Sequence, residues 1–391
     1  MKDRALKIVY VTPALYMAGG VERVLTLKAN YLAEHYGYDI TIVLTEGKGK
    51  PYFYPLSDKI KVVNLDVNFE ELWMCSFVKK IGVYLWKQHR YKKLLTAELM
   101  RLRPDVTVSL LRREINFLND IKDGSRKIGE LHINRANYRN FNTEQAGWVK
   151  RIFASFWSHN LIGHLRRLDR LVVLTEKDRE AWKELDNVVT IPDALSLSPT
   201  RVSDLSAKRV VAIARYSHEK GIDLLLQAWA VAAQHVAEWR LDIYGDGDRT
   251  DYEQLKDKLL IDRSRCTLHE RTNDVEQAYI DSSLFVLSSR FEGFGMVITE
   301  AMACGLPVVA FDCPWGPRSI IADGEDGLLV ENGNTQALAD AMVRLMSDAS
   351  LRQSMAAAGV KNVQRFGIAQ IAKQWKKLFE DVKGNDNENI K

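Results

Sequence analysis

The chain has 391 residues, a length that exceeds one ordinary hydrophobic core and fits two domains. Its hydrophobic fraction of 46% and charged fraction of 27% are typical of a soluble globular protein, and they exclude a disordered or fibrous chain. The net charge of +4 conceals an asymmetry, because residues 1–200 carry 32 Lys and Arg against 23 Asp and Glu while the remainder is acidic. A basic first half can face an anionic surface, but this balance does not indicate nucleic-acid binding.

The sequence pattern predicts neither a signal peptide nor a membrane-spanning helix. The charged start of residues 1–12 leads directly into a strand pattern, which is unlike a signal peptide. No apolar run approaches the roughly 18–20 residues of a membrane-spanning helix. Four scattered cysteines without metal-ligand spacing indicate free thiols in a reducing compartment, so the cytoplasm is the expected location.

The first half opens with a strand–helix–strand pattern. A β-branched apolar run covers residues 6–15, helical periodicity follows over 21–37, and a second strand is predicted over 38–47. Such an opening is typical of a parallel sheet covered by helices. Further strand patterns occupy residues 61–66, 105–111, 126–132, 170–175 and 187–193.

Residues 194–208 lose all periodicity and gather Ser, Pro and Asp, so they form the best linker in the chain. The alternation then restarts with predicted strands at 209–217, 239–247, 266–270, 283–289 and 306–312 and helices at 221–236, 252–260, 274–281, 296–304 and 368–383. The sequence therefore predicts an α/β protein with two Rossmann-like domains in series. We expect the first over residues 1–193 and the second over residues 194–367.

The segment 289–309, SRFEGFGMVITEAMACGLPVV, combines features of a ligand site. Ligands of parallel sheets bind beyond the carboxyl ends of the strands, where helices begin. Gly293 and Gly295 permit close approach, and the first helical turn near Met296 offers N–H groups to an anion. Glu292 and Glu300 can face one crevice and accept bonds from vicinal sugar hydroxyls; the alternative is a role in capping the helix.

Two cations follow the strand at 209–217. Arg215 lies just past the strand, and Lys220 precedes Gly221 and the next helix. A diphosphate needs such charge neutralisation and directed donors, whereas the alternative is two solvated surface cations.

Gly19 and Gly20 form a glycine pair between the first strand and helix, either approaching a phosphate or hydroxyl or making a plain tight turn. Neither this pair nor YGDGD at 244–248 completes the dinucleotide fingerprint, which disfavours a Rossmann dehydrogenase. No zinc, calcium, P-loop or nucleophile-elbow motif is present, so we expect no metal cofactor.

His132 ends a strand-like run in the first half, where a catalytic and a structural role are both open. Glu130, two residues earlier, shares its face if the strand is regular.

Basic and aromatic residues interleave over 73–101 and 139–170, which suits an anionic membrane surface. The alternative is ordinary helices with aromatics in the core and cations in water. The residues are Trp73, Phe77, Lys79, Lys80, Trp86, Lys87, Arg90, Lys92, Lys93, Trp148, Lys150, Arg151, Phe153, Phe156, Trp157, Arg166 and Arg167.

The segments EGFGMVITEAMACGLPVVA, RYSHEKGID and DGEDGLLVENGN, with VTPALYMAGGVERV near the start, together resemble the family 4 glycosyltransferases of GT-B fold. The match is dense over 209–334, while residues of about 50–190 match nothing diagnostic. The resemblance implies two Rossmann-like domains facing a central cleft, with the helix at about 368–383 packing back on the first domain. It also implies a retaining enzyme that uses a nucleotide sugar, with no bound cofactor.

Residue by residue, the resemblance implies that Arg215 and Lys220 bind the donor diphosphate and that Glu300 holds the ribose hydroxyls. Glu292 and the following Gly293, Phe294, Gly295 and Met296 would contact the transferred sugar. Gly19 and Gly20 would line the phosphate and acceptor side. His132 is the candidate for a first-domain histidine that approaches the sugar, and Glu130 is the alternative.

The expected function is therefore transfer of a sugar from a nucleotide-sugar donor, which we expect to be UDP-linked. The acceptor would be a hydroxyl of a glycan or of a lipid-linked acceptor in surface-polysaccharide synthesis. The transfer would take place in the cytoplasm, at the membrane face. Two alternatives remain: a sugar-nucleotide 2-epimerase of GT-B fold, and a non-catalytic glycan-binding protein.

Overall fold

The computed structural model describes residues 4–74, 77–138 and 160–384 of the chain. It divides into two compact units: unit 1 comprises Met1–Ala194 with Ile368–Lys391, and unit 2 comprises Leu195–Gly367. The division expected from the sequence falls one residue before this boundary. Residues 191–208, which contain the expected linker, carry no helix or strand.

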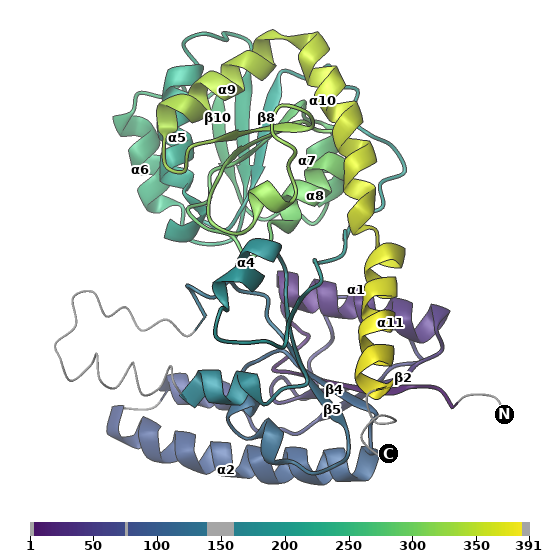
Figure 1. The fold of residues 1–391 in the computed structure, drawn as a ribbon. Coiled ribbons are helices and arrows are strands. Elements are labelled where there is room, and N and C mark those ends of the chain that lie inside the picture. The colour runs from purple at the N-terminus through teal and green to yellow at the C-terminus, as the bar shows by residue number, and fades with distance from the viewer. Residues whose placement is uncertain (1–3, 75–76, 139–159, 385–391) are drawn as a thin grey trace. The chain divides into compact units, whose positions relative to one another are not determined.

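Unit 1 is built on a seven-stranded parallel sheet with the strand order β3-β2-β1-β4-β5-β6-β7 (Figure 1). The strands are β1 (Lys7–Thr12), β2 (Asp39–Leu44), β3 (Lys61–Asn64), β4 (Val106–Ser109), β5 (Arg126–Glu130), β6 (Arg170–Val173) and β7 (Val188–Thr190). Its helices include α1 (Gly20–His35), α2 (Phe77–Leu102), α4 (Glu176–Ala181) and α11 (Ile368–Gly384), with short 3-10 turns at Phe69–Met74, Glu114–Asn116 and Leu118–Asp120. Residues 160–166 are also helical.

Alternate residues of each strand supply the two cores of this sheet, as the period of two requires. Ile8 and Tyr10 of β1 pack with α1 and α11, whereas Val9 and Val11 pack with α2. Helices α1 and α11 lie side by side (Figure 1) although they come from opposite ends of the chain. Trp375 of α11 is 2% exposed, so the C-terminal helix is part of the core of unit 1.

Unit 2 is built on a six-stranded parallel sheet with the order β10-β9-β8-β11-β12-β13. The strands are β8 (Arg209–Ile213), β9 (Arg240–Tyr244), β10 (Cys266–His269), β11 (Leu284–Leu287), β12 (Val308–Phe311) and β13 (Gly327–Val330). The helices are α5 (Ile222–Ala232), α6 (Thr250–Lys258), α7 (Val275–Ile280), α8 (Met296–Ala303), α9 (Thr335–Ser347) and α10 (Ala349–Asn362), with 3-10 turns at His218–Lys220, Pro317–Ser319 and Val363–Phe366.

The α/β class with two parallel sheets is confirmed, and each predicted strand exists, although most are shorter than the patterns indicated. Three elements of unit 2, β13, α9 and α10, were not predicted. In unit 1 the basic and aromatic segment after residue 76 is one long helix, α2. Within the described residues, no helix has the length and apolar character needed to cross a membrane.

Candidate active site

The loops that follow β8 and β11 are joined to each other in unit 2. These strands are direct neighbours in the sheet, so their carboxyl ends share one edge. The Arg290 N–H donates to the carbonyl oxygen of Glu219 at 2.8 Å, and the Ser288 hydroxyl donates to the carbonyl oxygen of Lys220 at 3.0 Å. The Arg290 guanidinium adds two bonds to Asp223, at 2.9 and 2.6 Å. These bonds therefore hold the two loops together at one edge of the sheet.

Lys220 and Glu292 meet at this edge. Lys220 Nζ donates to Glu292 Oε1 at 2.8 Å, and the Ser289 hydroxyl donates to the same oxygen at 2.6 Å. The side chain of Lys220 is 21% exposed and that of Glu292 is 9% exposed, so water screens this pair less than a surface ion pair. An ammonium has three donors, so Lys220 can hold the carboxylate and still offer a proton to an arriving anion.

Helix α8 begins beside this pair. Its N-cap is Gly295, which has a left-handed φ of 103° and provides no side-chain cap. The first amides of a helix have no partner four residues back, so the α8 N-terminus presents N–H groups and the positive end of its dipole. The Ile298 N–H is an exception, since it donates to the Gly295 carbonyl oxygen at 2.8 Å. The Gly316 backbone packs close behind, since a Cβ there would lie 2.5 Å from the Phe294 carbonyl oxygen and 2.7 Å from the Glu292 Cβ.

Glu300 lies in the second turn of α8 and is 3% exposed. Its Oε1 accepts a bond from the Ser196 hydroxyl at 2.6 Å, and its Oε2 accepts one from the Tyr279 hydroxyl at 3.3 Å. Both neighbours are hydroxyl donors, which is the chemistry that ribose hydroxyls would also supply.

Arg215 differs from Lys220 in its surroundings. Its side chain is 68% exposed and donates to Glu219 Oε1 at 2.6 Å. The structure therefore brings Lys220, and not the guanidinium of Arg215, into contact with Glu292.

Gly221 fixes the conformation of the Lys220 loop. Its φ of 61° is left-handed, and a Cβ at this position would overlap the carbonyl oxygen of Ser288. We expect Gly221→Ala to lower the free energy of unfolding by roughly 2–5 kcal/mol, because left-handed strain and a backbone clash add. Gly333→Ala is the matched control: its φ is 81°, but nothing lies within 4 Å of the added Cβ, so we expect a loss of about 1–2 kcal/mol. Urea unfolding of both variants checks this, and equal losses would contradict it.

In unit 1, His132 lies two residues beyond the end of β5 and is bracketed by two carboxylates. Its Nε2 is 3.2 Å from Glu130 Oε1, and its Nδ1 is 3.3 Å from Asp193 Oδ1. Burial alone would lower the pKa of His132, but Asp193 and then Glu130 raise it to about 9. The imidazole is therefore a protonated cation at neutral pH.

Gly19 and Gly20 lie at the N-terminus of α1, and the carboxyl group of Glu22 lies against the same turn. A Cβ on Gly19 would overlap the side chain of Glu22, which folds back over the turn. Burial raises the pKa of Glu22, although its own backbone N–H, Arg112 and His132 oppose the shift. The carboxyl group of Glu22 at this helix N-terminus can exchange hydrogen bonds with hydroxyl groups of an acceptor.

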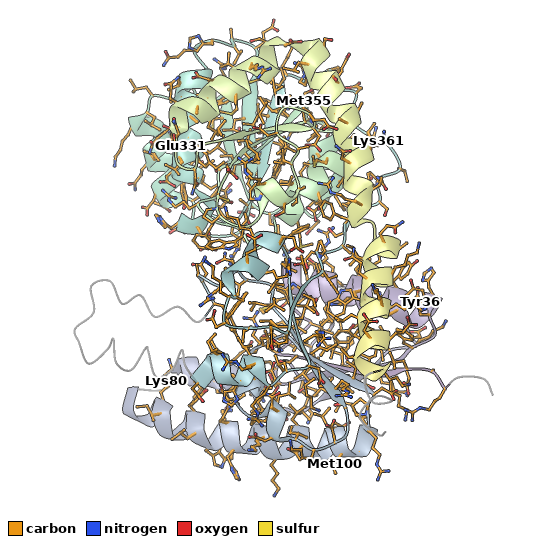
Figure 2. The ribbon with its side chains drawn as sticks, viewed as in Figure 1. Tyr36, Lys80, Met100, Glu331, Met355 and Lys361 are labelled. Carbon is orange, nitrogen blue, oxygen red and sulfur yellow. The ribbon has the colours of Figure 1, made fainter. Side chains whose placement is uncertain are left out.

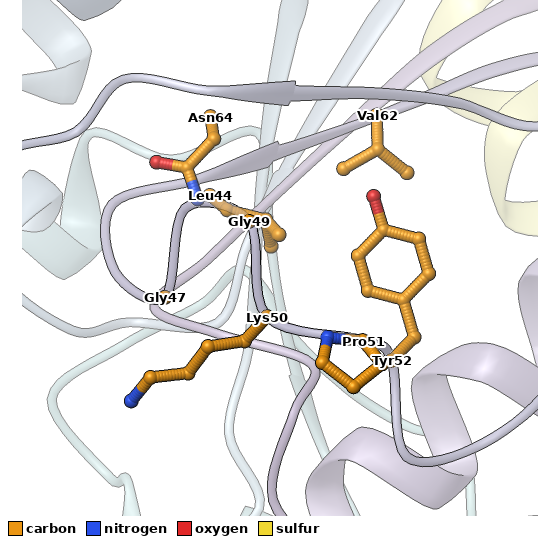
Figure 3. A pocket seen from close by; sticks show the side chains of 8 residues that line it. All are labelled: Leu44, Gly47, Gly49, Lys50, Pro51, Tyr52, Val62 and Asn64. Carbon is orange, nitrogen blue, oxygen red and sulfur yellow. The ribbon is translucent and has the colours of Figure 1, made fainter.

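A separate hollow of about 300 Å³ lies at the ends of β2 and β3 in unit 1 (Figure 3). The Tyr52 ring forms one wall opposite Val62, with Leu44 at the back, while Lys50 points away from the ring. Tyr52 is 44% exposed, so its ring is open to a ligand. Of the described residues, no three His, Cys, Asp or Glu side chains gather in a way that could hold a metal ion.

Comparison with known proteins adds family information to this geometry. Residues 207–348 match the family described as glycosyl transferases group 1. An uncharacterised glycosyltransferase of Haemophilus influenzae is 27% identical over 372 residues, covering 93% of this chain and 96% of that protein. A crystal structure of a Staphylococcus aureus TarM mutant, in complex with fondaparinux, α-GlcNAc-glycerol and UDP, superposes with a TM-score of 0.72 and 18% identity, covering 96% of this chain and 99% of that one.

The chain has the GT-B fold, and its residues 207–348 belong to the group 1 glycosyltransferases. It is also 24% identical over 385 residues to the amylovoran biosynthesis glycosyltransferase AmsD of Erwinia amylovora, covering 95% of this chain and 99% of that protein. The protein is therefore an enzyme of sugar transfer.

Several residues of this glycosyltransferase were not anticipated from the sequence. Ser289, Ser196 and Tyr279 orient the two expected carboxylates, and Asp193 is the second partner of His132. Trp315 has a positive φ of 78°, a strained conformation for a bulky residue, next to the close-packed Gly316. Asp193 could have been noticed because it ends a predicted strand. The sequence contains no comparable signal for Ser196 and Tyr279, whose hydroxyls come from segments distant from Glu300.

The side chain of Phe294, expected at the donor, is 3% exposed and packs edge-on against Phe366 with ring centroids 5.3 Å apart. Its backbone alone is left for contact with a ligand in the glycosyltransferase.

The residues expected at a membrane surface differ in their exposure. Lys87 is 3% exposed and donates to the carbonyl oxygens of Val67 and Asn68, so this lysine is not part of a surface, contrary to expectation. Trp86 is 58% exposed, against the alternative that the aromatics lie in the core. The side chains of Trp73, Phe77, Lys79, Trp148, Lys150, Arg151, Phe153, Phe156 and Trp157 lie outside the described part of the chain.

Proposed function

We propose that this glycosyltransferase moves a sugar from a UDP-linked donor, with retention of anomeric configuration, to a hydroxyl of a lipid-linked or growing glycan of a surface polysaccharide. The observation that carries the proposal is the Lys220–Glu292 pair beside the uncapped N-terminus of α8. The names of the relatives support it, since AmsD is named for amylovoran biosynthesis and the TarM structure contains UDP. No bound metal enters the proposal.

On the donor side, departure of the diphosphate builds oxocarbenium character on the sugar and negative charge on the leaving group. Lys220 and the first amides of α8 stabilise that charge more as it develops than before, which is what lowers a barrier. The Glu292 carboxylate, next to Lys220, accepts a hydroxyl of the transferred sugar. Glu300 takes the ribose hydroxyls in place of its contacts with Ser196 and Tyr279, and Arg215 adds a solvent-side cation at the diphosphate.

On the acceptor side, we assign the hollow at Tyr52 to a sugar ring of the glycan. The exposed Tyr52 ring can stack on a sugar ring. The apolar side chains of Leu44 and Val62 line the rest of the hollow and suit the apolar C–H face of a sugar. Gly19, Gly20 and Glu22 contact acceptor hydroxyls at the mouth of α1.

We expect Tyr52→Ala to raise the acceptor KM about two- to tenfold while the donor KM stays unchanged, because one aromatic contact contributes about 0.5–1.5 kcal/mol. Phe53→Ala is the matched control, since Phe53 is 46% exposed in the same loop but does not line the hollow. Steady-state kinetics at varied acceptor concentration measures both. An unchanged acceptor KM in Tyr52→Ala would remove the hollow from the acceptor site.

We assign the exposed face of α2 to an anionic membrane surface at the cytoplasmic side. The helix carries seven Lys and Arg against one Glu. Ile81, Leu85 and Trp86 are 54%, 62% and 58% exposed, beside the exposed Lys80 and Lys93. Lys80 and Met100 mark the two ends of this helix in Figure 2. Apolar residues beside cations are the composition that inserts into anionic headgroups.

We expect the double variant Leu85→Ser/Trp86→Ser to bind phosphatidylglycerol-containing vesicles about tenfold or more weakly, since it removes two apolar side chains from the lipid contact. Met100→Ser, which changes a 50% exposed residue of the same helix at its other end, is the control with unchanged binding. Vesicle co-sedimentation measures this. Equal binding by the wild type to neutral vesicles, or no effect of the double variant, would contradict the assignment.

Release of nucleoside diphosphate tests the proposed reaction. The enzyme is incubated with UDP-sugars, with and without a lipid-linked glycan acceptor, and we expect acceptor-dependent release of UDP and a product of unchanged anomeric configuration. Isomerised donor in the absence of acceptor would establish the 2-epimerase instead. Glycan binding without release of any nucleoside diphosphate would establish a non-catalytic protein.

A further inference from the structure

A chain of charged side chains with little exposure to solvent runs through unit 1, and the proposed donor chemistry makes no use of most of it. Lys28 of α1 is 1% exposed and forms an ion pair with Glu130, which is 2% exposed. Glu130 also lies against His132, and His132 against Asp193, which is 6% exposed. Four ionisable groups from α1, β5 and the segments after β5 and β7 are thus enclosed together.

The C-terminal helix closes one end of this chain. Lys28 Nζ lies 3.9 Å from the ring centroid of Trp375 on α11 and 5.3 Å from that of Tyr10 on β1. An ammonium over an aromatic face is held electrostatically, and more strongly when water is excluded. Burial lowers the pKa of Lys28, while the Glu130 carboxylate opposes that shift and keeps the charged form favourable.

With Lys28 and both carboxylates ionised, the charges balance only when His132 is protonated. With His132 protonated, two cations face two carboxylates and the buried group is neutral, whereas a neutral imidazole would leave one uncompensated negative charge. Each ring nitrogen of His132 also has a carboxylate oxygen as a near neighbour, at 3.2 Å for Nε2 and 3.3 Å for Nδ1. The ring is thus suited to act as a fixed positive charge rather than as a base.

We propose that Lys28 and Trp375 are positioning residues of this glycosyltransferase, which hold His132 through Glu130 as a permanently charged imidazolium at the carboxyl end of β5. The C-terminal helix thereby sets a charge on the acceptor side of the enzyme. The expected effect on kcat rests on the proposed function, whereas the protonation of His132 does not.

The charged groups around the imidazolium come from every element that packs on it. Glu130 belongs to β5, Asp193 follows β7, and Lys28 stands behind Glu130 on α1. Glu22 of α1 and Arg112, after β4, are further away but interact with this site, since Arg112 and His132 both lower the pKa of Glu22. The surplus of carboxylates facing the ring keeps it protonated.

The experiment follows the His132 imidazole by NMR of histidine-labelled full-length protein, with His132→Gln assigning its signals among the eight histidines. We expect wild-type His132 to remain protonated at pH 7.5 and to titrate above pH 8. Trp375→Leu should shift these ring signals and lower kcat about tenfold with the donor KM unchanged. Leu378→Ala, which changes another buried residue of α11 that offers no aromatic ring to the Lys28 ammonium, should lose comparable thermal stability but leave the His132 signals and kcat unchanged.

A charge-balanced pair of substitutions separates positioning from folding. Lys28→Met alone leaves an excess negative charge, whereas Lys28→Met/Glu130→Gln leaves the His132–Asp193 pair neutral, so the double variant should melt at a higher temperature than Lys28→Met. A neutral His132 at pH 7.5, or identical shifts in Trp375→Leu and Leu378→Ala, would overturn the proposal. These NMR results need no substrate, so a failure of sugar transfer would be distinguishable from a failure of this inference.

Discussion

Lys220→Met should lower turnover by about 10²–10³-fold while the protein stays folded. Lys220 is the cation that the structure places against Glu292, at 2.8 Å and with a side chain only 21% exposed. Removing one preorganised donor to a developing negative charge has this typical effect on rate. Glu292 keeps its bond from the Ser289 hydroxyl, so the loop retains a polar partner in the variant.

The control for Lys220→Met is Arg263→Met, which removes a 76% exposed cation of the same unit that is paired with Asp257. Kinetics at saturating donor, with circular dichroism as the folding check, measures both variants. Arg263→Met should retain wild-type turnover. Wild-type turnover in folded Lys220→Met would remove this lysine from the diphosphate site.

The stability of the protein should fall between about pH 6.5 and pH 9 through the release of one proton from His132. Its pKa is raised from 6.5 to about 9 in the folded state, because Asp193 and Glu130 outweigh the effect of burial. A group with a raised folded pKa stabilises fully below its unfolded pKa, and the stabilisation is lost as the pH rises through the folded pKa. A shift of this size corresponds to about 3 kcal/mol of unfolding free energy.

The measurement is urea unfolding of wild type and His132→Gln at intervals from pH 6 to pH 10. The difference between the two slopes isolates the contribution of His132 from that of other titrating groups. We expect the wild type to lose its advantage progressively across this range. Parallel curves for the two proteins would show that His132 is not held as a cation. Glu130, whose pKa is lowered to about 2 by Lys28 and then His132 against the effect of burial, has the opposite dependence: its stabilisation is lost as the pH falls below 4.5 through 2.

Local patterns were sufficient to predict every strand of the two sheets except β13. The apolar runs and the helix periodicity of residues 6–47 predict β1, α1 and β2, because strands buried on both faces and a helix buried on one face leave these patterns in the sequence. Helix α10 was missed since its buried residues, Arg352, Met355, Ala356 and Gly359, include a charge and a glycine and form no apolar stripe. Helix α2 was not predicted as one element because its aromatic and basic residues obscure the stripe of Tyr91, Leu95 and Leu99.

Candidate site residues could be named from the sequence, but most of their contacts could not. Glu292 and Lys220 both follow strands, but their pairing depends on β8 and β11 being neighbours, which local sequence does not state. Lys28 and Glu130 are 102 positions apart, and nothing near either residue signals a buried pair. Charges enclosed by tertiary packing therefore become visible only in the fold.

A crystal structure of the enzyme with UDP tests the account most directly. It should show the β-phosphate within hydrogen-bonding distance of Lys220 Nζ and of the first amides of α8, with the ribose hydroxyls at Glu300. Phosphates bound elsewhere, with Lys220 contacting Glu292 alone and the α8 N-terminus facing only solvent, would contradict it.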